Sequence, residues 1–323
     1  SLVRSFLEKL PKAELHVHLE GTLEPELLFE LAQRNNIELP YQTVEDVLAA
    51  YDFHDLPSFL AIYYPAMNVL RTEADFYILA YQYFERAAKQ NVIYCEPFFD
   101  PQAHTIRGVE FDTVINGISQ AQQDARKNLG LHSNLIMCFL RDHSAESAAE
   151  HLQIAQPHFD KLIGIGLDSD EKDNPPTKFS DTFNSARDAG LKLTMHCDVN
   201  QKDIHEHIRE CLDVIQVDRI DHGINRRPGK AKHPAKQAAA RNARAIADLI
   251  AGQGTINHPD SGNMLQGIDH IEEIGEFKAI LAKHILRECP AFGCARKLVG
   301  SIGLGKLAVC RPICATCTAR ATG

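Results

Sequence analysis

The stretch Ala13-Glu14-Leu15-His16-Val17-His18-Leu19-Glu20-Gly21-Thr22 decides how this chain is interpreted. It is typical of a short apolar strand that carries two histidines near its end. Side chains two residues apart in a strand point to the same face, so His16 and His18 are expected to project into one pocket. Two imidazoles on one strand are a typical metal-binding arrangement, although a pair of hydrogen-bonded histidines at a strand end gives the same pattern.

Short apolar runs alternate with amphipathic, helix-length segments through most of the chain. The predicted strands are Glu14–Leu19, Val92–Phe99, Leu135–Leu140, Leu162–Leu167, Leu191–His196 and Arg219–His222, with a weaker one at Gly254–Asn257. The predicted helices are Pro25–Arg34, Phe111–Lys127, Ser144–Ala155, Lys178–Ala189 and Asp203–Ile215. Repeated strand–helix units predict a parallel sheet, and their number favours a (β/α)8 TIM barrel in one domain over residues 1–323. Helical residues 41–90 are expected to form an insertion after the first strand.

Polar residues stand at or just after the ends of the predicted strands. They are His16, His18, Glu96, Arg141, Asp168, His196 and His222. The carboxyl ends of barrel strands form the face on which barrel enzymes assemble their catalytic groups. His196 therefore offers a third imidazole beside His16 and His18, and three nitrogens with an open position are typical of a hydrolytic zinc site. His222, at the next strand end, is placed to position or deprotonate a water molecule.

Composition bounds the class of protein. The chain has 323 residues and a formal net charge of −9, with no apolar run of membrane-spanning length. Residues 1–225 carry 19 basic and 36 acidic side chains, which argues against a nucleic-acid partner. The start of the chain lacks the apolar core of a signal peptide, and Cys95, Cys138 and Cys197 fall in apolar runs where reduced thiols usually pack. We expect a cytoplasmic protein with no membrane partner, and a nuclear location stays open.

Four segments resemble the adenosine and adenine deaminase family of amidohydrolase barrels. They are Leu10–Thr22, Glu96–Thr105 (Glu-Pro-Phe-Phe-Asp-Pro-Gln-Ala-His-Thr), Gly166–Ser169 (Gly-Leu-Asp-Ser) and Arg219–Gly223 (Arg-Ile-Asp-His-Gly). They occur in the family's order over about residues 1–225. The second and third segments look more like the adenine deaminase branch than the nucleoside enzymes.

The resemblance implies a set of roles. His16, His18 and His196 match the zinc ligands, and His222 matches the histidine beside the attacking water. The loop that contacts the purine ring in the family matches Gly166, Asp168 and Ser169. The family's apolar lid above the purine matches Phe53, Leu56, Phe59 and Tyr63, for which ordinary helix packing is the alternative interpretation. The implied reaction is hydrolytic deamination of a 6-aminopurine, most simply adenine to hypoxanthine and ammonia in purine salvage. Adenosine and N6-substituted adenines are the alternative substrates.

The chain departs from the family pattern at two acidic positions. The glutamate that protonates the ring three residues after the third histidine is replaced by Val199. Asp198 or a group from the following loop is the candidate replacement, and a substituted purine with another proton path is the alternative. No Asp-Asp pair, whose first member binds zinc in the family, occurs after residue 225, and Asp260 is a candidate substitute that comes one strand early. Taken as written, these losses predict weak zinc loading and slow deamination. The rival hypothesis is an impaired barrel that binds purines without hydrolysing them.

The last hundred residues differ in composition from the rest. Residues 226–323 carry 15 basic and 7 acidic side chains, the reverse of the balance before them. We interpret this segment as divergent, with degraded barrel strands, and an aberrant gene end such as a frameshift or retained intron is the simplest explanation. Its basic character is then no sign of a nucleic-acid partner.

Overall fold

The computed structural model describes residues 10–52, 56–197 and 204–223. Several predictions made above concern residues outside these ranges. They are the strand at Gly254–Asn257, the lid residue Phe53, the acidic candidates Asp198 and Asp260, the departure at Val199, and everything said of residues 226–323.

The strands of the described part form a parallel sheet. They are β1 (Lys12–His18), β2 (Val92–Phe99), β3 (His132–Ser133), β4 (Leu135–Leu140), β5 (Leu162–Asp168), β6 (Lys192–Cys197) and β7 (Arg219–His222). The order across the sheet is β1-β2-β4-β5-β6-β7, with the short β3 on β2, so neighbours in the sheet follow one another along the chain. This order is that of a singly wound barrel, as predicted.

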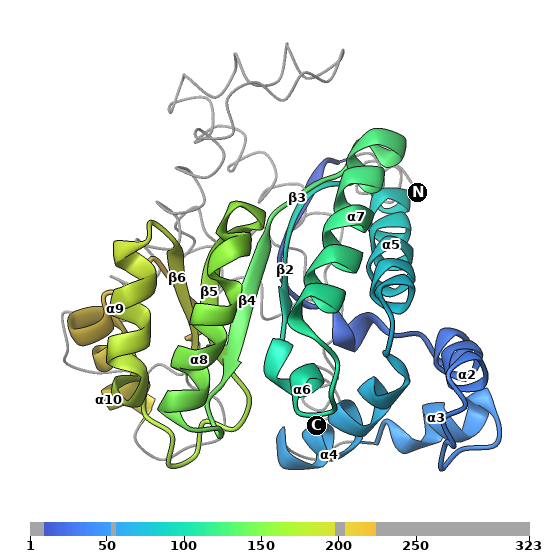
Figure 1. Cartoon of the computed structure of the whole chain (residues 1–323), viewed down its shortest axis with the longest axis horizontal. Coiled ribbons are helices and arrows are strands. Elements are labelled where there is room, and N and C mark those ends of the chain that lie inside the picture. The colour runs from blue at the N-terminus through green and yellow to red at the C-terminus, as the bar shows by residue number, and fades with distance from the viewer. Residues whose placement is uncertain (1–9, 53–55, 198–203, 224–323) are drawn as a thin grey trace, which may run out of the picture. The chain divides into compact units, whose positions relative to one another are not determined.

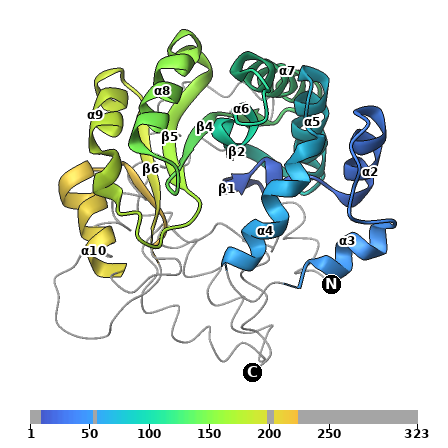
Figure 2. The same ribbon diagram turned by 60° about the horizontal axis from the view of Figure 1, so that its bottom comes forward.

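The sheet curls until its first and last described strands approach each other. The rings of His16 on β1 and His222 on β7 have centroids 4.7 Å apart, although these strands stand at opposite ends of the strand order. In Figure 2 the strands lie inside an arc of helices that runs from α10 round to α2. The fold is therefore a nearly closed α/β barrel of the TIM type.

Helices cover the outer face of the sheet (Figure 1). They are α2 (Pro25–Arg34), α3 (Val44–Ala50), α4 (Leu56–Ala66), α5 (Glu73–Lys89), α6 (Pro101–Thr105), α7 (Phe111–Leu129), α8 (Ala145–Ala155), α9 (Ser180–Asp188) and α10 (Ile204–Arg209). Short 3₁₀ helices form η1 (Glu20–Thr22), η2 (Met67–Val69), η3 (Gln156–Lys161) and η4 (Pro176–Phe179), and η5 (Glu210–Ile215) is a π-helical turn. The predicted insertion at 41–90 is α3, α4, η2 and α5.

Local sequence explains where these helices begin and how closely they pack. Capping boxes start α3, with Thr43 and Asp46, and α5, with Thr72 and Asp75. In each box the two side chains accept hydrogen bonds from each other's backbone N–H groups. α7 packs so closely on α5 that a Cβ at Gly117 would overlap the carbonyl oxygen of Glu73. These contacts fix the outer layer that supports the first half of the barrel.

The predicted element bounds agree with the structure to within about two residues. Val92–Phe99, Leu135–Leu140 and Arg219–His222 are confirmed as strands, and Pro25–Arg34 as a helix. The predicted helix Asp203–Ile215 is wrong in one respect, because its second half is the π-helical turn η5, which ends at Gln216 in a left-handed conformation. None of the helices in the described ranges combines the length and apolar character needed to cross a membrane.

Candidate active site

Four histidines from three strands meet at the carboxyl end of the barrel. His16 and His18 share one face of β1, His196 is the penultimate residue of β6, and His222 ends β7. In five of the six pairs among them, the ring centroids are 4.7 to 5.7 Å apart. The structure thus brings together all four residues that were predicted as ligands and base.

The rings of His18 and His196 face each other through their Nε2 nitrogens. His18 Nε2 and His196 Nε2 lie 3.0 Å apart. On the far side of the His196 ring, Nδ1 lies 3.1 Å from the carbonyl oxygen of Leu167. A carbonyl oxygen can only accept, so His196 carries its proton on Nδ1 and turns a lone pair on Nε2 toward His18.

The outer nitrogens of the two β1 histidines stand beside carboxylates. His18 Nδ1 is 3.4 Å from Asp168 Oδ2, and His16 Nδ1 is 3.6 Å from Asp221 Oδ1. With a proton on His18 Nδ1, the Nε2 lone pairs of His18 and His196 face each other, an arrangement that a cation between the two rings would stabilise. Carboxylate–histidine–metal chains have this form, since the carboxylate fixes the tautomer and the ring orientation.

The donor set fits a zinc ion. With Zn–N bonds of about 2.0–2.1 Å, two nitrogens on a tetrahedral edge stand roughly 3.4 Å apart, close to the His18–His196 separation. One nitrogen from each of His16, His196 and His222 also lies within 4.8 Å of the others. The side chains of His16 and His18 are about a quarter exposed, so the site is reachable from solvent.

The pKa values of two of these imidazoles favour the neutral form that a metal requires. Burial, together with the neighbouring His16, lowers the pKa of His196 well below its usual value. The same two causes lower the pKa of His222 to about 4. Both rings are therefore neutral at physiological pH.

Asp221 links the histidines to a buried ion network. Burial alone would raise its pKa, but the charge of Arg219 and the contact with His16 hold the pKa well below the usual range. Arg219 Nε donates to Asp221 at 3.1 Å, and the same guanidinium pairs with the buried Glu96. Asp221 also lies 3.9 Å from His196 Nδ1. One ionised carboxylate thus supports ligand candidates from two strands.

Arg141 supports the site from β4's end. It is fully buried, and its Nη1 donates to the backbone carbonyl of His196 at 2.6 Å. Its backbone N–H donates to the carbonyl of Asp168. These bonds fix the ends of β5 and β6 relative to each other, so Arg141 is a positioning residue.

Three buried carboxyl groups lie on the side of the site next to His18, and we call this group the wall. Glu20 follows β1, Asp100 follows β2 and Asp168 ends β5, and each is at most 4% exposed. Glu20 Oε1 accepts from the backbone N–H of Asp100 at 2.8 Å and lies 3.0 Å from His104 Nε2. Burial and the neighbouring Asp168 and Glu20 raise the pKa of Asp100 well above its usual value.

The described residues predicted to contact the purine lie on β5, directly after it, and on α4. Ser169, in a left-handed conformation (φ 72°), accepts a hydrogen bond from the Tyr64 hydroxyl at 2.9 Å. Phe59 stacks on Tyr63 along α4, with ring centroids 5.0 Å apart. Gly166 lies inside β5, where an added Cβ would overlap Cys138 Sγ, so packing alone explains this glycine. Its contact with a substrate stays a prediction.

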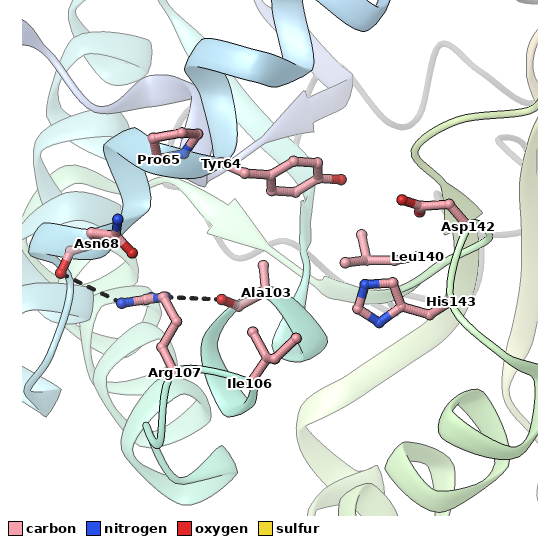
Figure 3. Close-up of a pocket in the computed structure, with 9 residues that line it drawn as sticks. All are labelled: Tyr64, Pro65, Asn68, Ala103, Ile106, Arg107, Leu140, Asp142 and His143. Carbon is pink, nitrogen blue, oxygen red and sulfur yellow. Dashed lines mark hydrogen bonds between the residues drawn. The ribbon is translucent and has the colours of Figure 1, made fainter.

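A pocket of about 320 Å³ borders the site at Tyr64 (Figure 3). Tyr64 and Pro65 come from α4, Ala103 from α6, and Asp142 and His143 follow β4. Arg107 lines the pocket but already donates to the carbonyl of Ala103 and contacts that of Asn68, so it is held by the protein. Figure 3 shows the Tyr64 ring pointing across toward Leu140 and Asp142.

Several site residues had not been given roles from the sequence. Arg219 and Asp221 are two residues apart on β7, so their side chains lie on the same face of the strand. This spacing could have indicated that they pair. Asp100 and His104 belong to the quoted Glu96–Thr105 segment, but their contacts with Glu20 join distant parts of the chain. The candidate acid Asp198 lies outside the described residues and stays a prediction.

A family model described as adenosine deaminase matches residues 11–231. An uncharacterized deaminase of Schizosaccharomyces pombe is 53% identical over 223 residues, which are 69% of this chain and 66% of that protein. The chain therefore spans just under two thirds of the length of this curated relative.

Solved structures agree in fold. A crystal structure of adenine deaminase from Arthrobacter aurescens is 43% identical with a TM-score of 0.65, covering 74% of this chain and 69% of that one. An amidohydrolase from Burkholderia ambifaria with bound zinc is 28% identical with a TM-score of 0.63, covering 76% and 65%.

Proposed function

Because the chain belongs to the adenosine deaminase family, we propose that it is a zinc-dependent enzyme that hydrolyses adenine to hypoxanthine and ammonia. The observation that carries the proposal is the pair of Nε2 nitrogens of His18 and His196 at 3.0 Å, with an acceptor beside each Nδ1. Two imidazoles with facing Nε2 atoms are typical of a pair that binds one metal cation. Adenine is favoured among 6-aminopurines because the Arthrobacter relative at 43% identity is an adenine deaminase.

His16, His18 and His196 are the residues that would hold the metal. Zinc is favoured by the neutral imidazole donors and by the zinc-bound Burkholderia structure. When bound, zinc lowers the pKa of water towards neutrality and so supplies a nucleophile for hydrolysis.

His222 is the proposed base. Its ring lies 4.7 Å from that of His16 and 5.2 Å from that of His196, beside the ligand candidates. Since its pKa is lowered to about 4, it is neutral at pH 7 and free to accept a proton from water. Asp221 and Arg141 keep the ligand strands in register while the proton moves.

The purine ring of the substrate is proposed to lie between the aromatic residues of α4 and the end of β5. Tyr63 and Phe59 offer apolar faces, while Asp168 and Ser169 offer polar atoms. The Tyr64–Ser169 hydrogen bond connects the α4 side to the β5 side of this space. Asp198 is the proposed source of the proton for the purine ring.

Zinc-dependent ammonia release tests the proposal. Purified protein is stripped with a chelator, reloaded with zinc and assayed for ammonia with adenine, adenosine and N6-substituted adenines side by side. Zinc is expected to restore activity, with adenine the preferred substrate. Ammonia release that ignores the chelator, or faster turnover of adenosine than of any free base, would overturn it.

Histidine variants provide the matched control. His196→Asn is expected to abolish zinc retention and activity together. His158→Asn replaces a histidine on η3, outside the barrel, where it pairs with the exposed Asp112. It is expected to behave as the wild type, which separates loss of the metal site from a general effect of removing an imidazole.

A further inference from the structure

Glu96 is a buried carboxylate that the proposed reaction does not use. It lies on β2 and is 1% exposed. Its Oε1 accepts a hydrogen bond from the Tyr94 hydroxyl at 2.7 Å, and its Oε2 pairs with Nη1 of Arg219 on β7. Both oxygens are therefore bonded to the protein rather than offered to a substrate. Burying a charge costs free energy even when it is paired, so a carboxylate at this place calls for an explanation.

The contact between Glu96 and Arg219 crosses the inside of the barrel. β2 and β7 are not neighbours in the sheet, since β2 pairs with β1 and β7 pairs with β6. The Arg219 guanidinium lies 5.7 Å from the centre of the Phe98 ring. That ring in turn packs against the rings of the three proposed zinc ligands, with centroids 4.9 to 5.3 Å apart. Glu96 and Arg219 therefore lie next to the layer that supports the histidine cluster.

Arg219 divides its donors between two carboxylates. Nη1 binds Glu96, and Nε donates to Asp221 Oδ1 at 3.1 Å. Burial alone would lower the pKa of Arg219, but the charges of Asp221 and Glu96 raise it, so the guanidinium stays cationic. Its Nη2 is buried and has no hydrogen-bond partner among the described residues. Two negative groups thus share one positive group, and one donor of that group is unused.

Asp221 is shared as well. Its Oδ1, which accepts from Arg219, also lies 3.6 Å from His16 Nδ1. Its Oδ2 accepts from the Thr194 hydroxyl and lies 3.9 Å from His196 Nδ1. Nε and Nη2 of an arginine lie on one edge of the guanidinium and can bind both oxygens of a carboxylate at once. If Arg219 turned both donors to Asp221, the carboxylate would be drawn away from the two histidines.

We propose that Glu96 is a positioning residue for the metal site, which holds Arg219 by Nη1 and thereby keeps Asp221 shared with His16 and His196. The inference rests on the proposed function, since it concerns the same metal site. Glu96 acts through a chain of contacts that runs from Arg219 to Asp221 and then to the histidines, without touching metal or substrate itself. The strand period provides this chain, because Arg219 and Asp221 share one face of β7.

Glu96→Gln tests the proposal, because glutamine keeps the size of the side chain and removes its charge. Arg219 is then expected to pair with Asp221 through both donors, and zinc affinity should fall by about 10–100-fold, as is typical when a group that orients metal ligands is changed. Competition with a chromogenic chelator measures the affinity. The KM for adenine of the zinc-saturated enzyme should not change. Asp188→Asn, at the exposed end of α9, is the control and should keep the wild-type affinity.

A double variant separates positioning from a general structural role. Glu96→Gln with Arg219→Gln lacks the guanidinium that would capture Asp221, so it is expected to bind zinc more tightly than Glu96→Gln alone. If Glu96 only stabilised the fold, the second substitution would add to the damage instead. Urea unfolding of the zinc-free proteins shows whether each is folded. Where this double variant does not fold, Arg219→Lys replaces Arg219→Gln, because lysine cannot form a bidentate pair with a carboxylate.

Two results would overturn the inference while leaving the proposed function in place. One is a zinc affinity of Glu96→Gln equal to that of the wild type, and the other is a folded double variant that binds zinc no better than Glu96→Gln. A wild-type protein that neither binds zinc nor releases ammonia from any 6-aminopurine would instead overturn the proposed function, and the inference with it.

Discussion

His16 on β1 and Asp221 on β7 approach to 3.6 Å between Nδ1 and Oδ1, joining the first and last described strands of the barrel. The same carboxylate lies 3.9 Å from His196 Nδ1 and accepts a hydrogen bond from Arg219. A single buried aspartate thus lies beside two ligand candidates that come from different strands, β1 and β6.

Asp221→Asn should weaken zinc binding without removing a proposed ligand. An amide supports the imidazoles less strongly than an ionised carboxylate, and changes of this kind typically cost 10–100-fold in metal affinity. Competition with a chromogenic chelator measures the change. Asp188→Asn serves again as the control, and an unchanged zinc affinity in Asp221→Asn would contradict the positioning role.

His222→Asn should slow catalysis while zinc binding persists. Removing a general base typically costs 10²–10⁴-fold in rate, and the other three histidines remain to hold the metal. Steady-state kcat for adenine is compared with zinc content in the same preparation. If zinc is lost in parallel with activity, His222 is a ligand, as its closeness to His16 and His196 would also permit.

Asp75 should contribute to stability at neutral pH and lose that contribution in acid. Burial alone would raise its pKa. The pKa is lowered instead by hydrogen bonds that the carboxylate accepts from the backbone N–H groups of Arg71 and Thr72 and from the Asn35 side chain, each 2.8 Å long. The Arg34 guanidinium also donates a hydrogen bond to this carboxylate. A carboxyl whose pKa is lowered on folding stabilises the protein above its unfolded pKa of about 3.9, and the effect disappears as pH falls through the folded pKa. Asp75→Asn should therefore cost about 3 kcal/mol at pH 7.

Urea unfolding of Asp75→Asn and the wild type at pH 7, 5 and 3 checks this prediction. The difference in unfolding free energy should be full at pH 7 and 5 and smaller at pH 3. Asp46→Asn, at the exposed capping box of α3, is the control and should cost only about 1 kcal/mol. A gap for Asp75→Asn that stays constant down to pH 3 would contradict the charge-based explanation.

The sequence predicted local features well and long-range pairings poorly. Strands such as Leu135–Leu140 were predictable because a continuous apolar run marks a strand buried on both faces. The convergence of His16, His18, His196 and His222 followed from strand-end positions in a barrel. The wall of Glu20, Asp100 and Asp168 did not, because its members follow three different strands and nothing in each local sequence records the others. The π-helical turn at Glu210–Ile215 was missed because its residues keep the apolar spacing of an ordinary helix.

Gly117→Ala should destabilise the barrel by loosening the contact between α5 and α7. The added methyl group would overlap the carbonyl oxygen of Glu73 and lie 2.9 Å from Phe76 Cβ, so the two helices must separate. Overpacking of this kind costs about 1–3 kcal/mol, although alanine otherwise favours a helix over glycine. Gly130→Ala, which ends α7 at φ 66° with no atom near the added Cβ, is the comparison that isolates backbone strain, with an expected cost of about 1–2 kcal/mol. Thermal unfolding of both variants measures the difference, and a Gly117→Ala protein that is more stable than the wild type would show that the α5–α7 contact can relax around a methyl group.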